Sequence, residues 1–293
     1  MLASLGQNLV FGILVGALYG LVALGLSLIF GVTKFLNVAH GELLMFGGYV
    51  CFWAFKLLGL DPFLSIPLTF AVLFIIGAFI YKAVFSRTAK LDEESKIKNT
   101  MLVAFGLSVI LQNLALRFWT ADERGVPTAY AGVSYEMLGI RFPLVRVASL
   151  VVAVVFLVLL QLFLRNTYTG KAIRATTQNW EAASLMGIDI HKMYLISFSI
   201  GAALAGVAGT LVIVNFAIHP AMGLGWTMKA LVVMVLGGLG SIPGAMIGGL
   251  ILGVTESATS FFINSNYREV AGLLLFLLVL ILRPQGLFGI KEN

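Results

Sequence analysis

The stretch that best indicates the architecture of this chain is residues 227–262, with the sequence TMKALVVMVLGGLGSIPGAMIGGLILGVTESATSFF. A helix needs about 20 apolar residues to cross the hydrocarbon core of a bilayer, so this run is too long for one ordinary span. Glycines and Pro243 interrupt it within residues 237–244, where proline removes a backbone donor and glycine weakens a helix. We therefore predict a glycine- and proline-broken helix, which gives two short crossings or half-helices.

Other apolar runs on the chain have the length of a membrane span. They occupy residues 7–31, 38–56, 62–86, 99–119, 143–164, 193–216 and 268–283. Charged residues make up only 11% of the chain, against about 25% in a typical soluble domain. The sequence therefore predicts an all-α, polytopic transmembrane helix bundle with about eight to nine spans, in a single domain covering residues 1–293.

The distribution of basic residues predicts the orientation of this bundle. They gather in two loops, with Lys82, Arg87, Lys90, Lys96 and Lys98 in residues 82–98 and Arg165, Lys171, Arg174 and Lys192 in residues 165–192. Two crossings separate these loops, so both lie on one side, and the positive-inside rule makes that side the cytoplasm. The N-terminus and loop 120–142 are then external, and the C-terminus is cytoplasmic. The same bias accounts for the net charge of +6, so we expect a lipid bilayer and no nucleic acid as a partner.

The cytoplasmic loop 165–192 contains a polar, basic island at residues 170–187. Within it, Asn179 can cap a short helix, Glu181 lies in the first turn, and Gly187 suits the C-terminal end. So short a helix is not stable alone and needs a docking surface. The alternative is an amphipathic connector that lies on lipid headgroups.

A second polar cluster, Asn37, His40 and Glu42, begins an otherwise apolar run. Ionisable residues at bilayer depth are costly and usually line a cavity or pair within the bundle. One interpretation places these residues on a translocation path. The other makes them an interfacial turn, in which Asn37 lies among the headgroups and caps the next helix, while the positive end of that helix favours Glu42.

Small residues recur along the broken run at the spacing of a helical face, as at Gly240, Gly244 and Gly248. Such a face lets helices approach closely, and broken backbone at membrane depth must be buried or line a cavity. One interpretation is packing alone. The other is a path lined by candidates from this run, namely Gly238, Gly240, Ser241 and Glu256. For the similar face formed by Gly12, Gly16 and Gly20 we expect packing.

The core of the island, Glu181-Ala182-Ala183 followed by Gly187, resembles the EAA-type loop of ABC-importer permeases. In that class the loop forms a short helix that docks into a separate ATPase subunit. The resemblance therefore implies a set of ATPase-coupling residues, namely Arg174, Glu181, Ala182, Ala183 and Gly187. The loop of the wider class usually ends in a proline pattern, which residues 187–191 lack.

Several segments spread over the chain carry a wider resemblance: Asn37–Glu42 with Gly47 and Gly48, Gly170–Ala175, Ala205–Gly209, Gly237–Ser241 and Leu282–Gly289. They resemble the membrane subunit of bacterial branched-chain amino-acid ABC importers, and most of all the shorter of the two permeases. The resemblance implies an inner-membrane heterodimer with a longer sister permease, two cytoplasmic ATPase subunits and a periplasmic substrate-binding protein. It also implies that the solute is a branched-chain or related amino acid.

Several motifs are missing from the sequence. There is no G-x-x-x-x-G-K-[ST] run, so we expect ATP to bind to partner subunits and no cofactor to bind to this chain. The histidines are scattered and no run brings a base and a nucleophile together, so we expect neither a metal site nor an enzyme. A self-contained secondary transporter is the alternative, because broken helices and intramembrane polar residues are typical of that class, but it has no use for an ATPase-docking loop.

Overall fold

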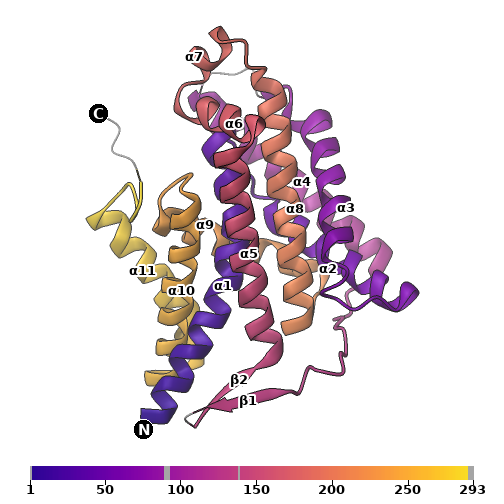
Figure 1. Cartoon of the computed structure of the whole chain (residues 1–293), viewed down its shortest axis with the longest axis vertical. Coiled ribbons are helices and arrows are strands. Elements are labelled where there is room, and N and C mark those ends of the chain that lie inside the picture. Colours follow the sequence, from indigo (N-terminus) through magenta and orange to yellow (C-terminus); the bar gives the residue numbers. More distant parts are fainter. Residues whose placement is uncertain (1, 89–92, 138, 290–293) are drawn as a thin grey trace.

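The computed structural model of the chain describes residues 2–88, 93–137 and 139–289. Within these ranges, nine helical segments are long and apolar enough to cross a membrane, which confirms the polytopic bundle and the higher of the two predicted span numbers. The membrane-length helices are α1 (Leu2–Thr33), α2 (His40–Leu58), α3 (Ile66–Ile80) with the π-helical turn η1 (Tyr81–Phe85), α4 (Glu93–Trp119), α5 (Leu144–Asn166), α8 (Ile190–Asn215), α9 (Gly223–Gly237) after the turn η3 (Pro220–Met222), α10 (Ile242–Phe262) and α11 (Arg268–Leu282) after the turn η4 (Ser265–Tyr267). Two short helices, α6 (Tyr168–Gln178) and α7 (Trp180–Leu185), lie between α5 and α8 (Figure 1).

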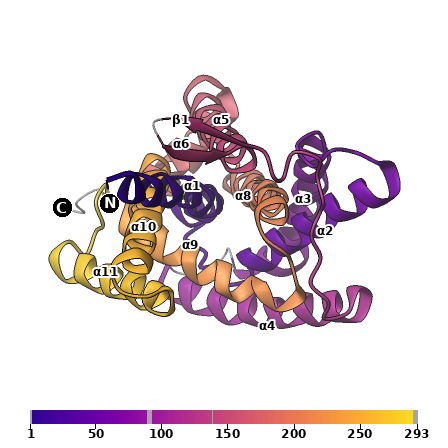
Figure 2. The ribbon, with the colours of Figure 1, turned by 90° about the horizontal axis from the view of Figure 1, so that it is seen from below.

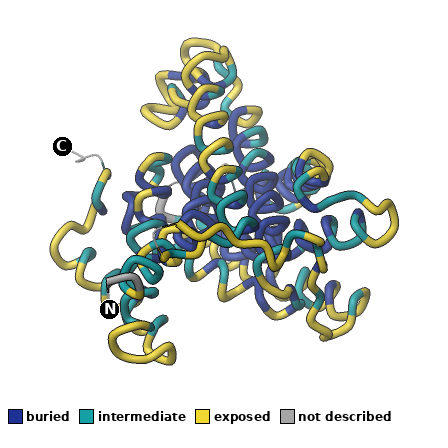
Figure 3. Tube along the Cα trace, turned by 60° about the horizontal axis from the view of Figure 1, so that its bottom comes forward, coloured by how far each residue is buried: buried dark blue, intermediate teal, exposed yellow. Residues whose placement is uncertain are grey.

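Helices α1 and α8 form the centre of the bundle. In their most apolar windows 78% and 89% of the residues are buried, against 6% in the span that contains α11. Seen from the end of the molecule, the other helices surround these two (Figure 2), and the buried residues gather along the middle (Figure 3). The outer helices keep large apolar side chains exposed, such as Phe79, Leu102 and Ile281. Apolar faces of this extent meet lipid or another membrane subunit.

Helix α1 packs against α10 through facing glycines. A methyl group on Gly16 would lie 2.7 Å from the carbonyl oxygen of Gly249, and one on Gly12 would lie 2.9 Å from that of Gly253. Backbones approach this closely only where side chains are absent. The packing role predicted for the glycine face of α1 is therefore confirmed, and part of the glycine ridge on α10 has the same role.

The long apolar run breaks into two helices that form an antiparallel hairpin. Helix α9 ends at Gly237 and α10 begins at Ile242, and between them Gly238 (φ 102°) and Gly240 (φ 79°) adopt backbone conformations that side chains disfavour. The predicted break is thus confirmed. Each of its two arms is long and apolar enough for a full crossing, since η3 with α9 covers 18 residues and α10 covers 21.

A pair of short strands, which the sequence did not predict, accompanies the helices. Strand β1 (Ser134–Met137) pairs with β2 (Ile140–Pro143) in an antiparallel hairpin. Strands of four residues carry too little alternation of polar and apolar side chains to stand out in a sequence. The hairpin lies beside the N-terminal end of α1, where the Gln7 Nε2 atom donates to the Arg141 carbonyl at 2.8 Å.

The rest of loop 120–142 crosses the same end of the bundle. Arg124 and Ile218 exchange backbone hydrogen bonds of 2.9 and 2.8 Å. The Tyr130 hydroxyl donates to Asp61 Oδ2 at 2.6 Å, and burial together with this carboxylate raises the pKa of Tyr130, so the phenol remains a donor. Helices α6 and α7 lie at the opposite end (Figure 1), as the predicted topology requires. Lys90 of the first basic loop and residues 290–293 lie outside the described residues.

Candidate functional site

The predicted coupling loop folds as two short helices: α6 packs against α1, α5 and α8, and α7 projects beyond the end of the bundle (Figure 1). Helix α6 begins where Thr167 Oγ1 accepts a hydrogen bond from the Gly170 amide at 3.0 Å. Helix α7 begins where Asn179 Oδ1 accepts from the Ala182 amide at 2.9 Å. Gly187 follows α7 with a φ of 82°. The roles predicted for Asn179 as an N-cap and Gly187 as a C-terminal residue are confirmed.

The outer face of α7 is apolar as well as charged. Leu185 and Met186 are 89% and 83% exposed, which is unusual for large apolar side chains outside a membrane span. Ala183, by contrast, is 5% exposed and faces the chain itself, so it is not on the surface that a partner would meet. The predicted coupling residues that are exposed are Arg174, Glu181, Ala182 and Gly187. Sequence reasoning missed Leu185 and Met186, although two large apolar residues at the end of a polar helix were a usable signal.

The polar cluster at the start of α2 is buried. Asn37 and His40 are 0% exposed and Glu42 is 1% exposed, so Asn37 does not lie among headgroups. Asn37 Oδ1 accepts from the Ala39 amide at 3.2 Å and closes the turn before α2, whose N-cap position is Ala39. Asn37 therefore does not cap the helix, whereas Glu42 lies in its first turn as predicted.

Two ionisable side chains of this cluster have incomplete hydrogen bonding. His40 Nε2 is 3.0 Å from the Val22 carbonyl oxygen, and Glu42 Oε1 accepts from the Ser108 hydroxyl at 3.1 Å. His40 Nδ1 and Glu42 Oε2 are buried without a partner among the described residues. Unpartnered polar atoms at this depth are costly, which agrees with the interpretation of a functional cluster.

Other parts of the chain form hydrogen bonds with the backbone at the break between α9 and α10. Ser241 Oγ accepts from the Gly244 amide at 3.2 Å as the N-cap of α10, and the Ser241 carbonyl accepts from Ser27 Oγ at 3.3 Å. The C-terminal tail also reaches the break, because the Leu287 and Phe288 amides donate to carbonyls at the end of α9, at 3.0 and 3.1 Å. The polar groups of Ser241 are thus engaged within the chain, and a path role for Gly238, Gly240 and Ser241 stays a prediction.

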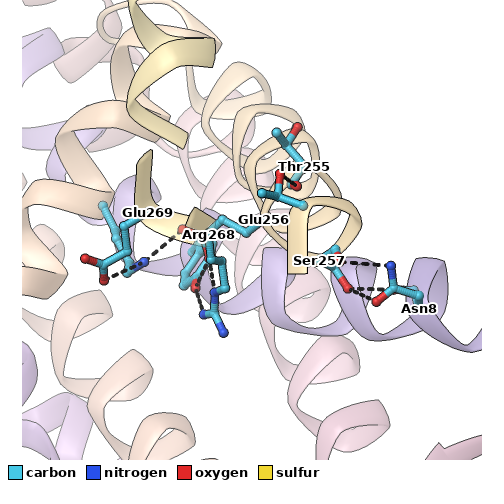
Figure 4. A network of polar contacts seen from close by, with 9 residues as sticks. Asn8, Thr255, Glu256, Ser257, Arg268 and Glu269 are labelled. Atoms are coloured by element: carbon cyan, nitrogen blue, oxygen red, sulfur yellow. Dashed lines mark hydrogen bonds and ion pairs between the residues drawn. The ribbon is translucent and has the colours of Figure 1, made fainter. Parts of the chain in front are cut away.

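Glu256 is the centre of an ion network inside the bundle. It is 3% exposed and accepts from the Tyr19 hydroxyl at 2.7 Å, from Lys229 Nζ at 2.8 Å and from Arg268 Nε at 2.9 Å. Arg268 Nη2 also donates to the Tyr19 oxygen at 2.9 Å. The network joins α1, α9, α10 and α11, and Figure 4 shows Arg268 beside Glu256. Sequence reasoning named Glu256 but missed its partners, of which Lys229 and Arg268 could have been found as ionisable residues in apolar runs.

The candidate residues do not form one site, because they contact different levels of α1. The break meets α1 at Gly31, His40 meets it near Gly25, and Glu256 meets it at Tyr19. Helix α9 links the last two groups: Glu42 packs against its first residue, and Lys229 lies further along the same helix. The polar groups therefore follow α1 and α9 through the bundle as a series.

Comparison with known proteins gives consistent results at the level of sequence. A family described as "Branched-chain amino acid transport system / permease component" matches residues 8–282. The high-affinity branched-chain amino acid transport system permease proteins BraD of Pseudomonas aeruginosa and LivH of Escherichia coli K12 are 33% and 34% identical to this chain. Each alignment covers 98% of this chain and 96% of the relative. These relatives are described as transport permeases and not as enzymes.

Weaker similarities extend beyond this group. The ribose import permease RbsC of Haemophilus influenzae is 29% identical over 56% of this chain and 50% of its own length. A chain in the solved structure of PsaBC from Streptococcus pneumoniae in complex with Fab has a TM-score of 0.51, with 97% of each chain covered, at 13% identity. This structural similarity shows the fold alone. The family match over nearly the whole length shows that this chain belongs to the permease components of branched-chain amino acid transport systems.

Proposed function

We propose that this chain is the shorter permease of an ABC importer and forms part of the path by which branched-chain or related amino acids cross the bacterial inner membrane. It pairs with a second, longer permease subunit. Two cytoplasmic ATPase subunits bind the ATP, and a periplasmic substrate-binding protein delivers the solute. This chain itself binds no cofactor and carries out no chemical reaction.

The observation that carries the proposal is the surface of α7. A short helix with Leu185 and Met186 exposed is stabilised when a partner covers those side chains, since burial of apolar surface contributes about 25 cal/mol per Å². Glu181 and Arg174 on the same projection supply charges that set the register of a docked protein. A connector that lies on lipid headgroups does not need a capped helix that projects beyond the end of the bundle, as α7 does (Figure 1).

The orientation is part of the same proposal. With α6 and α7 in the cytoplasm, the β1–β2 hairpin and the N-terminus are external, and so is the strap formed by loop 120–133. The polar groups at His40, Glu42 and Glu256 then follow one another between the two sides. Intramembrane ionisable residues in such a series are typical of a solute path.

The test is reconstitution with and without the partner subunits. The complex of both permeases and the ATPases, placed in liposomes with the binding protein, should accumulate leucine, isoleucine or valine only with ATP. This chain alone, given a proton or sodium gradient, should accumulate none of them. Uptake by the chain alone would instead support the self-contained secondary transporter.

A further inference from the structure

A cavity of about 590 Å³ opens beside the ion network, at the end of the bundle that carries the N-terminus and the β1–β2 hairpin. Its size falls in the ~300–1,000 Å³ range of ligand pockets. The wall is formed by α1, α10, α11 and the hairpin, and it includes Gln7, Asn8, Phe11, Ser260, Phe261 and Arg268. None of the residues predicted from the sequence as a solute site lines it except Glu256.

Arg268 offers a fixed guanidinium to this cavity. Its Nε donates to Glu256 and one Nη2 hydrogen reaches Tyr19, so the Nη1 group and the second Nη2 hydrogen have no partner among the described residues. The side chain is 40% exposed, whereas that of Glu256 is 4% exposed. A guanidinium whose one edge is held by a buried carboxylate is pre-organised to bind a second carboxylate or phosphate oxygen with its other edge.

The charge around the cavity favours an anionic group. Glu256 is paired with both Lys229 and Arg268, so a single buried carboxylate faces two cations. Arg146 adds a third cation: its guanidinium lies 3.6 Å from the centre of the Phe11 ring, which lines the cavity, and its Nη1 atom is buried without a hydrogen-bond partner among the residues that the structure describes. Glu269 lies 3.7 Å from Lys229, but its side chain is 80% exposed, so it offsets the excess positive charge only weakly.

The lining of the cavity also contains apolar side chains. Phe11, Val15 and Phe261 line it, while the hydroxyl groups of Ser4 and Ser260 lie in the same cavity. A ligand that suits this lining is small, carries a carboxylate at one end and an aliphatic side chain at the other, and can donate from an ammonium group to hydroxyl oxygens. A free amino acid with a branched side chain has these properties.

We propose that this cavity is a binding site for the transported amino acid, with the α-carboxylate on the free edge of Arg268 and the aliphatic side chain against Phe11 and Phe261. The inference rests on the proposed function, because it takes the solute from there. Arg146 contributes to the field that attracts the carboxylate. The site lies at the proposed external end of the path, where a solute arrives first.

The test uses the assembled importer in lipid nanodiscs and measures protection of an introduced thiol. In the variant Ser260→Cys, a small polar thiol reagent should label the cavity, and leucine should slow that labelling with a saturable dependence on concentration. The matched control is Phe262→Cys, on the same helix but 67% exposed and outside the cavity lining. It should be labelled at a rate that leucine does not change.

A second variant assigns the carboxylate contact. Arg268→Lys in the Ser260→Cys background keeps a cation beside Glu256 but loses the fork geometry that binds a carboxylate through two hydrogen bonds. The half-protecting leucine concentration should rise roughly tenfold, as expected for one lost charge-assisted hydrogen bond. Unchanged protection in this variant would overturn the assignment of Arg268.

Other outcomes separate this inference from competing explanations. If the thiol introduced by Ser260→Cys never reacts, or if leucine does not protect it, the site is overturned. Labelling that depends on anionic lipid in the nanodisc and not on leucine would show that a lipid phosphate occupies the cavity. Failure of the wild-type complex to take up leucine with ATP would instead contradict the proposed function, and leucine protection can be measured independently of it.

Discussion

The substitution Glu256→Gln tests the ion network most directly. The wild-type carboxylate is 3% exposed and accepts hydrogen bonds from Tyr19, Lys229 and Arg268. An amide keeps the shape but has one acceptor oxygen, and its NH₂ group faces either Lys229, at the place of Oε1, or Arg268, at the place of Oε2. Breaking a fully buried ion pair by removing one partner costs about 3–5 kcal/mol. The cost here should be about 3 kcal/mol, because water partly reaches the remaining cations: the Lys229 and Arg268 side chains are 21% and 40% exposed.

The matched control removes the other carboxylate that lies near Lys229. Glu269 lies 3.7 Å from Lys229 but its side chain is 80% exposed, so Glu269→Gln should cost no more than about 0.5 kcal/mol. The difference between the two variants follows from burial and geometry, since both remove one negative charge near Lys229.

Thermal unfolding of the purified chain in detergent measures this difference. Cys51 is the only cysteine of the chain and is 0% exposed, so a dye that becomes fluorescent on reaction with thiols reports unfolding. With about 2–4 °C per kcal/mol, Glu256→Gln should lower the Tm by roughly 6–12 °C and Glu269→Gln by less than about 2 °C. Equal melting of Glu256→Gln and wild type would refute the reasoning, because it would mean that the network contributes nothing to the bundle.

Three further predictions concern other parts of the chain. Gly16→Leu should prevent assembly of the bundle in fluorescence-detected gel filtration, because a side chain there meets backbone of the facing helix at 2.7 Å, while Gly106→Leu, with open space, should elute normally. Ala182→Trp should leave the Tm of the chain unchanged, since the residue is exposed, yet reduce co-purification of the ATPases and ATP-driven uptake at least tenfold; full uptake would make α7 a simple connector. Tyr130→Phe removes the 2.6 Å hydrogen bond to Asp61 at a cost of about 1–3 kcal/mol, so limited proteolysis should cut loop 120–133 faster than in wild type, and an unchanged rate would show that this bond does not hold the strap.

The sequence by itself determined the features that depend on local composition. The spans followed from apolar runs of membrane length, and the break at 237–244 followed from glycine and proline within one such run. The caps of α7 at Asn179 and Gly187 and the glycine face of α1 are equally local, because each depends on residues within one or two helical turns. These predictions needed no knowledge of which helices are neighbours. The sequence did not predict the β1–β2 hairpin, because strands of four residues carry too weak a periodic signal.

Only the tertiary structure decided which polar residues meet. Glu256 was a candidate on its own, but its partners come from three other helices, at positions 19, 229 and 268. Ala183 matched a docking motif, yet the packing of α7 turns its side chain inward. Asn37 carried the residue type of a helix cap, yet the helix begins too late for it to serve as one. Hydropathy and capping depend on residues that are neighbours along the chain. Contacts between helices depend on how the helices rotate and cross, and the packing of small residues determines both. These contacts can join residues more than two hundred positions apart, such as Tyr19 and Glu256.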